Sequence, residues 1–396
     1  MSLAVGVGPQ HRWCWSVVTA LIAAVGWMSA APAAASDTAP WSATVRTSGY
    51  ETDRVVSLSF DAGSDAGDVA SILGTLRAQG ITAGFGLSGR FVEQFPSAAR
   101  AIAADGHTVF NHSYSHPDFT TLTQAQRFAE LDRTEAAFRA AGLRTARWFR
   151  APFKAGYADS GLNRDLALRG SYVNFDWTYD TTGYTGASVA TILSRVRTYT
   201  RPGTIVLGHV GAASTDAEAL PDVIRTLREM GYRFTDPSRT LTYGAIRPRY
   251  DAVRFLGAPR TVEMATSGGR VQWFDGGRIY WSTGTGAREV YGAILGTYLR
   301  HADTAGFLGF PVTGELPTPD GPGRYNHFQG GSVYWSPTTG AWEVHGAIRD
   351  KWAQLGWERS GLGYPTSDEY AILGGRRSNF QNGYITWTPT GGAVVH

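Results

Sequence analysis

The chain has 396 residues, 43% of them hydrophobic, which is long enough for two domains. Its formal net charge is only +3, so charge gives no reason to expect nucleic acid as a partner. The 13 Trp and 49 Gly residues are typical of a secreted protein that handles sugars and has many tight turns.

The N-terminal segment has the pattern of a secretory signal peptide. A basic start precedes an apolar stretch that ends in small residues, and Ala33 and Ala35 match an A-x-A cleavage rule. We therefore expect a signal peptide over residues 1–35. The alternative, a membrane anchor, requires a longer apolar run and a stop-transfer segment. The single cysteine, Cys14, lies in this segment, so we expect no disulfides and no thiol chemistry in the mature protein.

Residues 55–241 alternate short apolar runs with longer amphipathic ones. This alternation predicts strands separated by helices, and hence a parallel sheet with helices outside it, either open or closed as a barrel. The short apolar segments are, in chain order, 55–60, 81–88, 107–113, 146–152, 171–177, 203–211 and 232–236. The predicted helices are 68–80, 96–106, 123–142, 188–199 and 219–231.

Polar residues fall at or just after the ends of these apolar segments. They are Asp61, His112, Arg150, Asp180 and His209. Because the carboxyl ends of the strands carry the chemistry in barrels of this kind, these five residues are the first candidates for a site.

After about residue 241 the sequence becomes repetitive. LGxP recurs at 256–259, 308–311 and 362–365, and each copy is followed by an aromatic-ended segment at 277–281, 331–335 and 383–387. A period of about fifty residues indicates a repeat array. Each unit is predicted to contain a short helix, the LGxP turn and two strands around a Gly-rich hairpin. No acid pair or His cluster recurs with the repeat, which favours a binding module over a second enzyme.

The stretch SFDAGSD places Asp61 and Asp65 just after the first apolar segment. Because a buried carboxylate is costly without a partner, the pair predicts either shared chemistry or a turn that one acid caps. His112 and His116 are four residues apart, which on a helical turn puts both imidazoles on one side. Two imidazoles and one carboxylate form a catalytic zinc set with an open position, whereas the histidine spacing alone is also common in unrelated histidines.

The other three candidates have local interpretations. Arg150 precedes a proline that stiffens its loop, so it is either a clamp for a catalytic carboxylate or a surface arginine. His209 follows an apolar segment and is either a core histidine or a functional one. Asp180 is a candidate for the carboxylate that orients and charges His209.

Taken in order, SFDxG, HSxxH, RxPF, DxxGY and LxH resemble the motifs of the polysaccharide deacetylase family, carbohydrate esterase family 4. The resemblance covers about half of the chain, roughly Val55 to Leu241. It implies an α/β fold, a distorted (β/α) barrel. It also implies a hydrolase that removes N- or O-acetyl groups from sugar polymers with a divalent metal, zinc being the expected one.

The resemblance also implies roles for the motif residues. Asp61 would be the general base, held by Arg150, and His209 would be the general acid, with its pKa set by Asp180. His112 and His116 would hold the metal, and the backbone N–H of Phe153 would help to stabilise the oxyanion. The residues in this implied site are Asp61, His209, Arg150, Asp180, Phe153, His112 and His116.

The chain departs from the family pattern at two places. The first family motif usually reads TFDDG, and its second acid is a metal ligand, but Ala62 stands there in this chain. Three outcomes are open: Asp65 supplies the missing carboxylate, Asp61 ligates directly, or the domain is a metal-poor sugar-binding remnant. We predict the first, with Asp65 as a metal ligand. The fourth motif usually reads DxxDW, and here Gly183 and Tyr184 replace its last two residues.

The LGxP units resemble LGFP repeats, which are found in secreted envelope proteins of actinobacteria and imply attachment to the cell wall. The expected organisation is a signal peptide at 1–35, a linker at 36–50, a deacetylase-like domain at 51–241 and a wall-binding repeat domain at 243–396. We expect a secreted, wall-associated monomer that acts on peptidoglycan or chitin-like polymers. The rivals are a non-catalytic wall-binding protein and an O-acetyl esterase of the xylan type.

Overall fold

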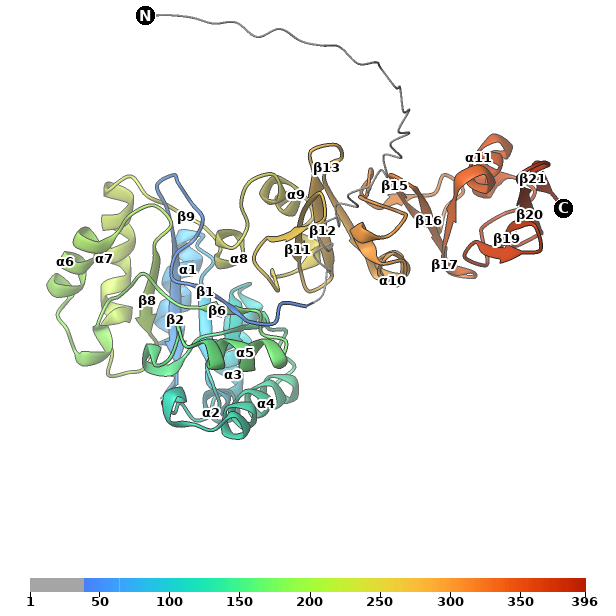
Figure 1. Cartoon of the computed structure of the whole chain (residues 1–396). Helices are drawn as coiled ribbons and strands as arrows, with labels where there is room; N and C mark the ends of the chain where they lie inside the picture. The colour runs from blue at the N-terminus through green and yellow to red at the C-terminus, as the bar shows by residue number, and fades with distance from the viewer. Residues whose placement is uncertain (1–38, 64) are drawn as a thin grey trace, which may run out of the picture. The chain divides into compact units, whose positions relative to one another are not determined.

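The computed structural model describes residues 39–63 and 65–396 (Figure 1). The predicted signal peptide and the first residues of the predicted linker lie outside this range. Within it, no helix combines the length and the apolar character needed to cross a membrane.

The N-terminal half contains a nine-stranded sheet in which every strand pair is parallel. The strand order is β1-β6-β5-β4-β3-β2-β8-β7, and β9 pairs with β2. No pairing joins β1 to β7 in the described residues, so the barrel is incomplete, as the predicted distorted (β/α) barrel requires. The strands are β1 (Thr44–Arg46), β2 (Val55–Ala62), β3 (Gly84–Leu87), β4 (Thr108–Asn111), β5 (Trp148–Phe149), β6 (Val173–Phe175), β7 (Tyr179–Asp180), β8 (Ile205–His209) and β9 (Arg233–Phe234).

Helices follow most of these strands and lie around the sheet (Figure 1). They are α1 (Val69–Gln79), α2 (Gly89–Gln94), α3 (Pro96–Ala104), α4 (Gln124–Ala140), α5 (Ser160–Leu168), α6 (Val189–Tyr199), α7 (Asp216–Glu229) and α8 (Pro237–Thr240). In α7, the buried Leu220, Val223, Ile224 and Leu227 recur at helical spacing and form one apolar face. Burial of such faces against the sheet builds the main core of this half.

Strand β2 lies inside the sheet, between β3 and β8, and all eight of its residues are buried. This fits its mainly apolar sequence, since a central parallel strand is covered on both faces. Its carboxyl end places Asp61 opposite Gly86 of β3 and His209 of β8. A Cβ added at Gly86 would lie 2.5 Å from Asp61 Oδ1, so only glycine leaves room for this carboxylate.

The C-terminal region consists of three antiparallel sheets of four strands each. The prediction of two strands per unit was therefore too low, because each hairpin is flanked by a short strand before it and by a further strand after it. The strands are β10 (Met264–Thr266), β11 (Gly269–Trp273), β12 (Gly277–Ser282), β13 (Gly286–Tyr291), β14 (Leu316–Pro317), β15 (Arg324–Phe328), β16 (Gly331–Ser336), β17 (Gly340–His345), β18 (Tyr370–Ile372), β19 (Gly375–Phe380), β20 (Gly383–Thr388) and β21 (Gly392–Val395). The helices are α9 (Ile246–Ala252), α10 (Gly292–Arg300) and α11 (Gly346–Leu355).

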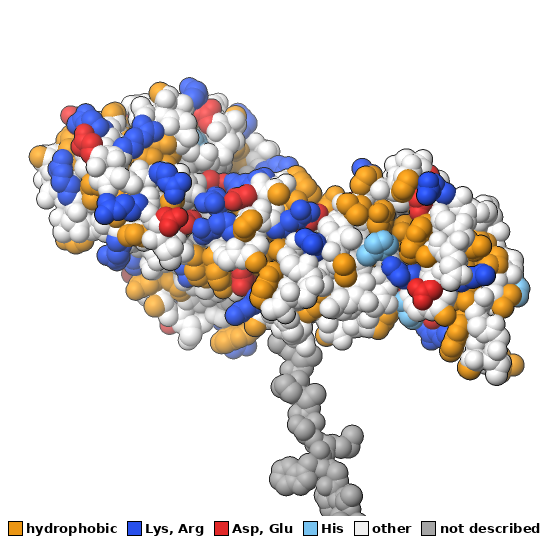
Figure 2. Space-filling model, turned by 90° about the horizontal axis from the view of Figure 1, so that it is seen from above, with side chains coloured by type: hydrophobic (Ala, Val, Ile, Leu, Met, Phe, Trp, Pro, Cys, Tyr) orange, Lys and Arg blue, Asp and Glu red, His pale blue; other side chains and the backbone are white. Residues whose placement is uncertain are grey.

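The LGxP turn has the same structural role in each repeat. Its proline forms an isolated β-bridge to a phenylalanine, in the pairs Pro259–Phe274, Pro311–Phe328 and Pro365–Phe380. The repeat aromatics are largely core residues, as predicted, since Tyr280 and Tyr334 at the YW positions are buried. On the face shown in Figure 2, basic, acidic and hydrophobic side chains are interspersed, consistent with the small net charge.

Candidate active site

Asp61 and Arg150 form a buried ion pair at the carboxyl end of β2. The Arg150 Nη1 donates to Asp61 Oδ1 over 2.8 Å, so the contact predicted between them is present. Arg150 is fully buried, and its other donors bond Ser59 Oγ and the Phe175 carbonyl. Burial alone would raise the pKa of Asp61, but Arg150, with smaller contributions from His112 and His209, holds it below its usual value. Asp61 is therefore an ionised carboxylate in a fixed orientation.

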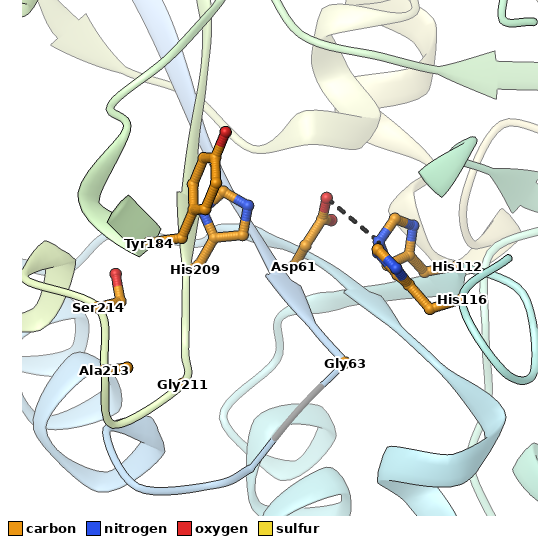
Figure 3. Close-up of a pocket in the computed structure, with 9 residues that line it drawn as sticks. All are labelled: Asp61, Gly63, His112, His116, Tyr184, His209, Gly211, Ala213 and Ser214. Atoms are coloured by element: carbon orange, nitrogen blue, oxygen red, sulfur yellow. Dashed lines mark hydrogen bonds and ion pairs between the residues drawn. The ribbon is translucent and has the colours of Figure 1, made fainter. Parts of the chain in front are cut away.

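His112 and His116 face each other beside this carboxylate. Their Nε2 atoms are 3.1 Å apart, and His112 Nε2 lies 3.5 Å from Asp61 Oδ2 (Figure 3). His112 Nδ1 is 3.0 Å from the Arg150 carbonyl, which fixes the proton on Nδ1 and leaves the Nε2 lone pair toward the pocket. Burial lowers the pKa of His112 to about 4, so its imidazole is neutral at pH 7.

The loop that carries the two histidines is held by local hydrogen bonds. The Ser113 N–H donates to Asn111 Oδ1, and the His116 N–H donates to Ser113 Oγ. His116 has φ 62°, in the left-handed region, so it does not continue a helical turn from His112. The two imidazoles thus meet through a loop, although the predicted helical spacing would also have placed them on one side.

Asp65 does not join this histidine pair in the described structure. Its Oδ1 accepts hydrogen bonds from the N–H groups of Gly67 and Ala212, both over 2.8 Å. The carboxylate therefore holds the turn before α1 to the loop after β8, which is the turn alternative considered for it. The predicted role of Asp65 as a metal ligand stays a prediction, and the observed contacts favour the turn alternative.

His209 lies at the end of β8 and is paired with an acid that the sequence interpretation missed. The Asp216 Oδ2 accepts from the His209 backbone N–H over 2.9 Å and lies 3.7 Å from His209 Nδ1. Burial alone would lower the pKa of His209, but the contact with Asp216 and the charges of Asp61, Asp180 and Asp216 together raise it. The imidazole thus retains its proton to higher pH than a free histidine.

Asp216 also explains the altered fourth motif. A Cβ added at Gly183 would lie 2.4 Å from Asp216 Cγ, so the Asp216 carboxylate fills the space of a side chain at 183. The acid that the family motif has at that position is here supplied from the first turn of α7. Little in the sequence indicated this role. Asp216 lies in the first turn of a helix, where Ser214 donates to it over 2.9 Å, and an acid in that place is usually interpreted as a residue that stabilises the helix N-terminus.

Asp180 lies near His209 without being its contact partner. Its Oδ1 accepts from the Thr182 N–H over 2.7 Å, and its charge is one of those that raise the pKa of His209. Tyr184, which replaces the last aromatic residue of the fourth motif, packs against His209. Its ring centroid lies 4.7 Å from that of His209.

Phe153 adopts φ 57° in the RxPF loop, which turns its backbone toward the left-handed region. The next two N–H groups, of Lys154 and Ala155, bond back to Ala151 and Pro152. The Phe153 N–H donates no hydrogen bond within the part of the chain that the structure describes, and the Phe153 ring packs edge-on against His116 at 4.6 Å. This N–H is thus available to a ligand beside the histidine pair.

Asp61, the histidine pair, His209 and Tyr184 line one pocket of about 310 Å³. Its lining is Asp61, Gly63, His112, His116, Tyr184, His209, Gly211, Ala213 and Ser214. Figure 3 shows Asp61 between two groups of side chains, with the histidine pair on one side and His209 with Tyr184 on the other. A carboxylate, a histidine pair, a third histidine and an aromatic ring therefore share one cavity.

The histidine pair fits a divalent metal ion. Two neutral imidazole nitrogens 3.1 Å apart have the spacing of two ligands on one ion, and an N–H to carbonyl contact fixes one of them, as is usual for metal-binding histidines. The nearest carboxylate oxygen is Asp61 Oδ2, while Ala62 offers no ligand atom. In the described residues, the set whose donor atoms all lie within 4.8 Å of one another is His301, Glu343 and Asp368, not this one.

Comparison with known proteins identifies both halves of the chain. A model described as polysaccharide deacetylase matches residues 48–168, and one described as LGFP repeat matches 256–306, 308–360 and 362–396. A chitooligosaccharide deacetylase of Rhizobium leguminosarum bv. trifolii is 30% identical over 46% of this chain and 80% of its own length. The chain belongs to the polysaccharide deacetylase family. The resemblance predicted from the ordered motifs is thereby confirmed.

Other proteins that are similar to this chain carry different names. A peptidoglycan-N-acetylglucosamine deacetylase of Bacillus cereus is 29% identical over 45% of this chain and 65% of its own length, so the chain spans less than two thirds of that relative. A solved structure of a pseudoenzyme of carbohydrate esterase family 4 from Bacillus anthracis is 27% identical over 50% of this chain and 69% of that one, with a TM-score of 0.47.

Proposed function

We propose that this polysaccharide deacetylase is a secreted, metal-dependent enzyme that removes N-acetyl groups from cell-wall amino sugars. The observation that carries the proposal is the placement of one ionised carboxylate, Asp61, between an imidazole pair and a second, acid-paired histidine. Relatives named as peptidoglycan-N-acetylglucosamine and chitooligosaccharide deacetylases support an N-acetylated glucosamine polymer as the substrate.

Asp61 acts as the general base. Arg150 occupies Oδ1, so Oδ2 is the oxygen that faces the pocket and the histidine pair. It takes a proton from a water molecule as the oxygen of that water bonds to the acetyl carbonyl carbon. The Phe153 N–H donates to the carbonyl oxygen as it gains negative charge.

His209 acts as the general acid. Its raised pKa keeps the imidazolium populated near neutral pH, so it delivers a proton to the sugar nitrogen as the carbon–nitrogen bond breaks. The products are acetate and the free amino sugar. Asp216 is a positioning residue for this step because it touches His209 and not the pocket centre.

His112 and His116 would hold the divalent metal, for which we propose zinc. When bound, such an ion polarises the acetyl carbonyl and lowers the pKa of a water molecule.

Export and wall attachment belong to the same proposal. Residues 1–35 would direct secretion, residues 36–50 would be a linker, the catalytic domain would span 51–241, and the LGFP repeats in 243–396 would bind the cell envelope. The repeat match supports the wall as the place of action. We propose a monomer with no nucleic-acid partner.

A second candidate function rests on Ala62 and on the turn role of Asp65. With no acid next to Asp61, the domain would bind wall polymers without catalysis. Acetate release from N-acetylglucosamine oligomers and from peptidoglycan separates the two. We expect release that rises with added zinc and stops with a chelator, whereas no release with added zinc or cobalt would leave the binding function. Release from acetylated xylan alone would instead indicate an O-acetyl esterase.

A further inference from the structure

The three LGFP repeats meet at a cluster of three potential metal ligands. His301, Glu343 and Asp368 each come from a different repeat segment, and their ligand atoms all lie within 4.8 Å of one another. His301 Nε2 lies 3.2 Å from Asp368 Oδ2 and forms no hydrogen bond with any described residue. Two carboxylates and one imidazole are the donor types of a three-ligand zinc site.

The preceding junction between repeat segments has different residues at the positions that match this cluster. Arg249 and His301 both lie seven residues before the leucine of an LGxP turn, and Glu289 matches Glu343 in the EVY and EVH segments. Arg249 Nη2 donates to Glu289 Oε1 over 2.6 Å, in a bidentate ion pair. The first junction is therefore joined by an arginine–carboxylate bridge.

The position of Asp368 confirms that the two junctions are equivalent. Asp368 lies six residues after its LGxP leucine, and the same position of the repeat before it is Gly314. A Cβ added at Gly314 would lie 2.3 Å from Glu289 Oε1 and 2.6 Å from Arg249 Nη2. Gly314 thus lies beside the Arg249–Glu289 ion pair, as Asp368 lies beside His301 and Glu343.

The second junction carries more acidic side chains than the first. Arg249 and Glu289 have opposite charges beside the uncharged Gly314, whereas Glu343 and Asp368 are two acids beside one imidazole. Glu343 is 1% exposed, so its carboxylate has little access to solvent. A buried carboxylate beside a second acid is unfavourable unless a cation compensates it.

The surrounding side chains hold the carboxylates of the cluster in place. His345 Nδ1 is 2.8 Å from Glu343 Oε2, and the Glu369 N–H donates to Glu343 Oε1. Arg376 Nε bonds Glu369 Oε1, not Asp368. The cation near Asp368 is Arg300, at 3.8 Å and with a side chain 55% exposed. These contacts fix the orientation of the Glu343 carboxylate, as hydrogen-bond partners outside the coordination sphere do for a metal ligand.

We propose that His301, Glu343 and Asp368 bind one divalent cation of the zinc type, which joins the three LGFP repeats. The ion does at this junction what the Arg249–Glu289 bridge does at the first. Because the three ligands are far apart in the chain and come together only in the folded array, binding stabilises the folded repeats.

The test uses the full mature chain with His112→Ala and His116→Ala, which removes the other imidazole pair. Bound zinc is measured by mass spectrometry after dialysis against Zn²⁺ alone, and the unfolding midpoint is measured with and without Zn²⁺. The matched control adds His301→Arg and Asp368→Gly, which copies the first junction of the same chain. Asp368→Asn in the same background is the variant that keeps side-chain volume.

We expect the background chain to bind one Zn²⁺ and to unfold at a higher temperature when it is present. The control with the copied ion pair should bind none and should unfold at a temperature that Zn²⁺ leaves unchanged. Asp368→Asn should weaken binding by about 10-fold or more. A background chain that binds no Zn²⁺, or a control that binds as much as the background, would overturn the proposal.

Discussion

The carboxylate of Asp216 occupies the space in which a side chain at Gly183 would lie, 2.4 Å from an added Cβ. The family motif has an acid at the position of Gly183, and this chain carries its acid on α7 instead. Because Asp216 contacts the backbone N–H and the ring of His209, the charge beside that histidine is retained although the residue that supplies it has changed.

Replacing Asp216 tests this exchange. Asp216→Ala should lower kcat/KM for an N-acetylglucosamine oligomer by about 10- to 100-fold, because the orientation and charge of His209 are lost. His209→Ala should cost more, about 10²- to 10⁴-fold, because it removes the acid itself. The pair Gly183→Asp with Asp216→Gly returns the acid to its family position and should recover activity relative to Asp216→Gly alone. No recovery, with a normal circular dichroism spectrum, would contradict the exchange.

The pH dependence of activity should also reflect the contact between Asp216 and His209. His209 must be protonated to act as the acid, so activity should fall as pH rises through its pKa, which lies above the ordinary histidine value. Asp216→Asn removes one of the charges that raise this pKa. We therefore expect the alkaline limb of the kcat/KM profile to move to lower pH in that variant. An unchanged limb would mean that another group titrates there.

Measurements of bound metal should distinguish the role of the histidine pair from that of Asp65. His112→Ala and His116→Ala should each lose bound metal and activity, since the two Nε2 atoms form the donor pair. Asp65→Ala should keep the metal of the catalytic site. It should also lower the free energy of unfolding by about 1–3 kcal/mol, because two hydrogen bonds to Asp65 are lost. A metal-free Asp65→Ala protein that remains folded would support the ligand role predicted from sequence.

The Arg150–Asp61 pair should be strongly coupled in stability. Arg150→Met leaves Asp61 buried without its cation and should cost about 3–5 kcal/mol in urea unfolding. Adding Asp61→Asn to this variant removes the buried, unpaired charge and should recover part of the lost stability. A coupling energy above about 0.5 kcal/mol in the double-mutant cycle is the expected result, and simple additivity would argue against a paired role.

The sequence predicted the parts of the site that depend on strand ends. Asp61 follows a mainly apolar run that becomes the central strand β2, and His209 ends β8 beside it. Arg150 also reached its predicted partner, because a conformationally restricted loop follows β5. The strand-end placements follow from local pattern and from the parallel sheet, whereas the Arg150–Asp61 contact was implied by the resemblance to the family.

The parts that the sequence did not predict depend on tertiary space. Asp216 lies 33 positions after Gly183, and only the folded backbone shows that its carboxylate fills the empty place. The turn role of Asp65 depends on the Ala212 N–H, which β8 brings beside it. The four-stranded repeats were underestimated because their outer strands, such as β14 with Leu316 and Pro317, are too short to show a period.

The most direct test of the central claim is acetate release from an N-acetylglucosamine oligomer by the wild type and by Asp61→Asn, with bound metal measured in the same samples. We predict that Asp61→Asn loses about 10²-fold or more of the rate while it keeps the metal of the wild type. A variant that keeps the wild-type rate would show that Asp61 is not the base, and one that loses its metal together with its rate would make Asp61 a ligand.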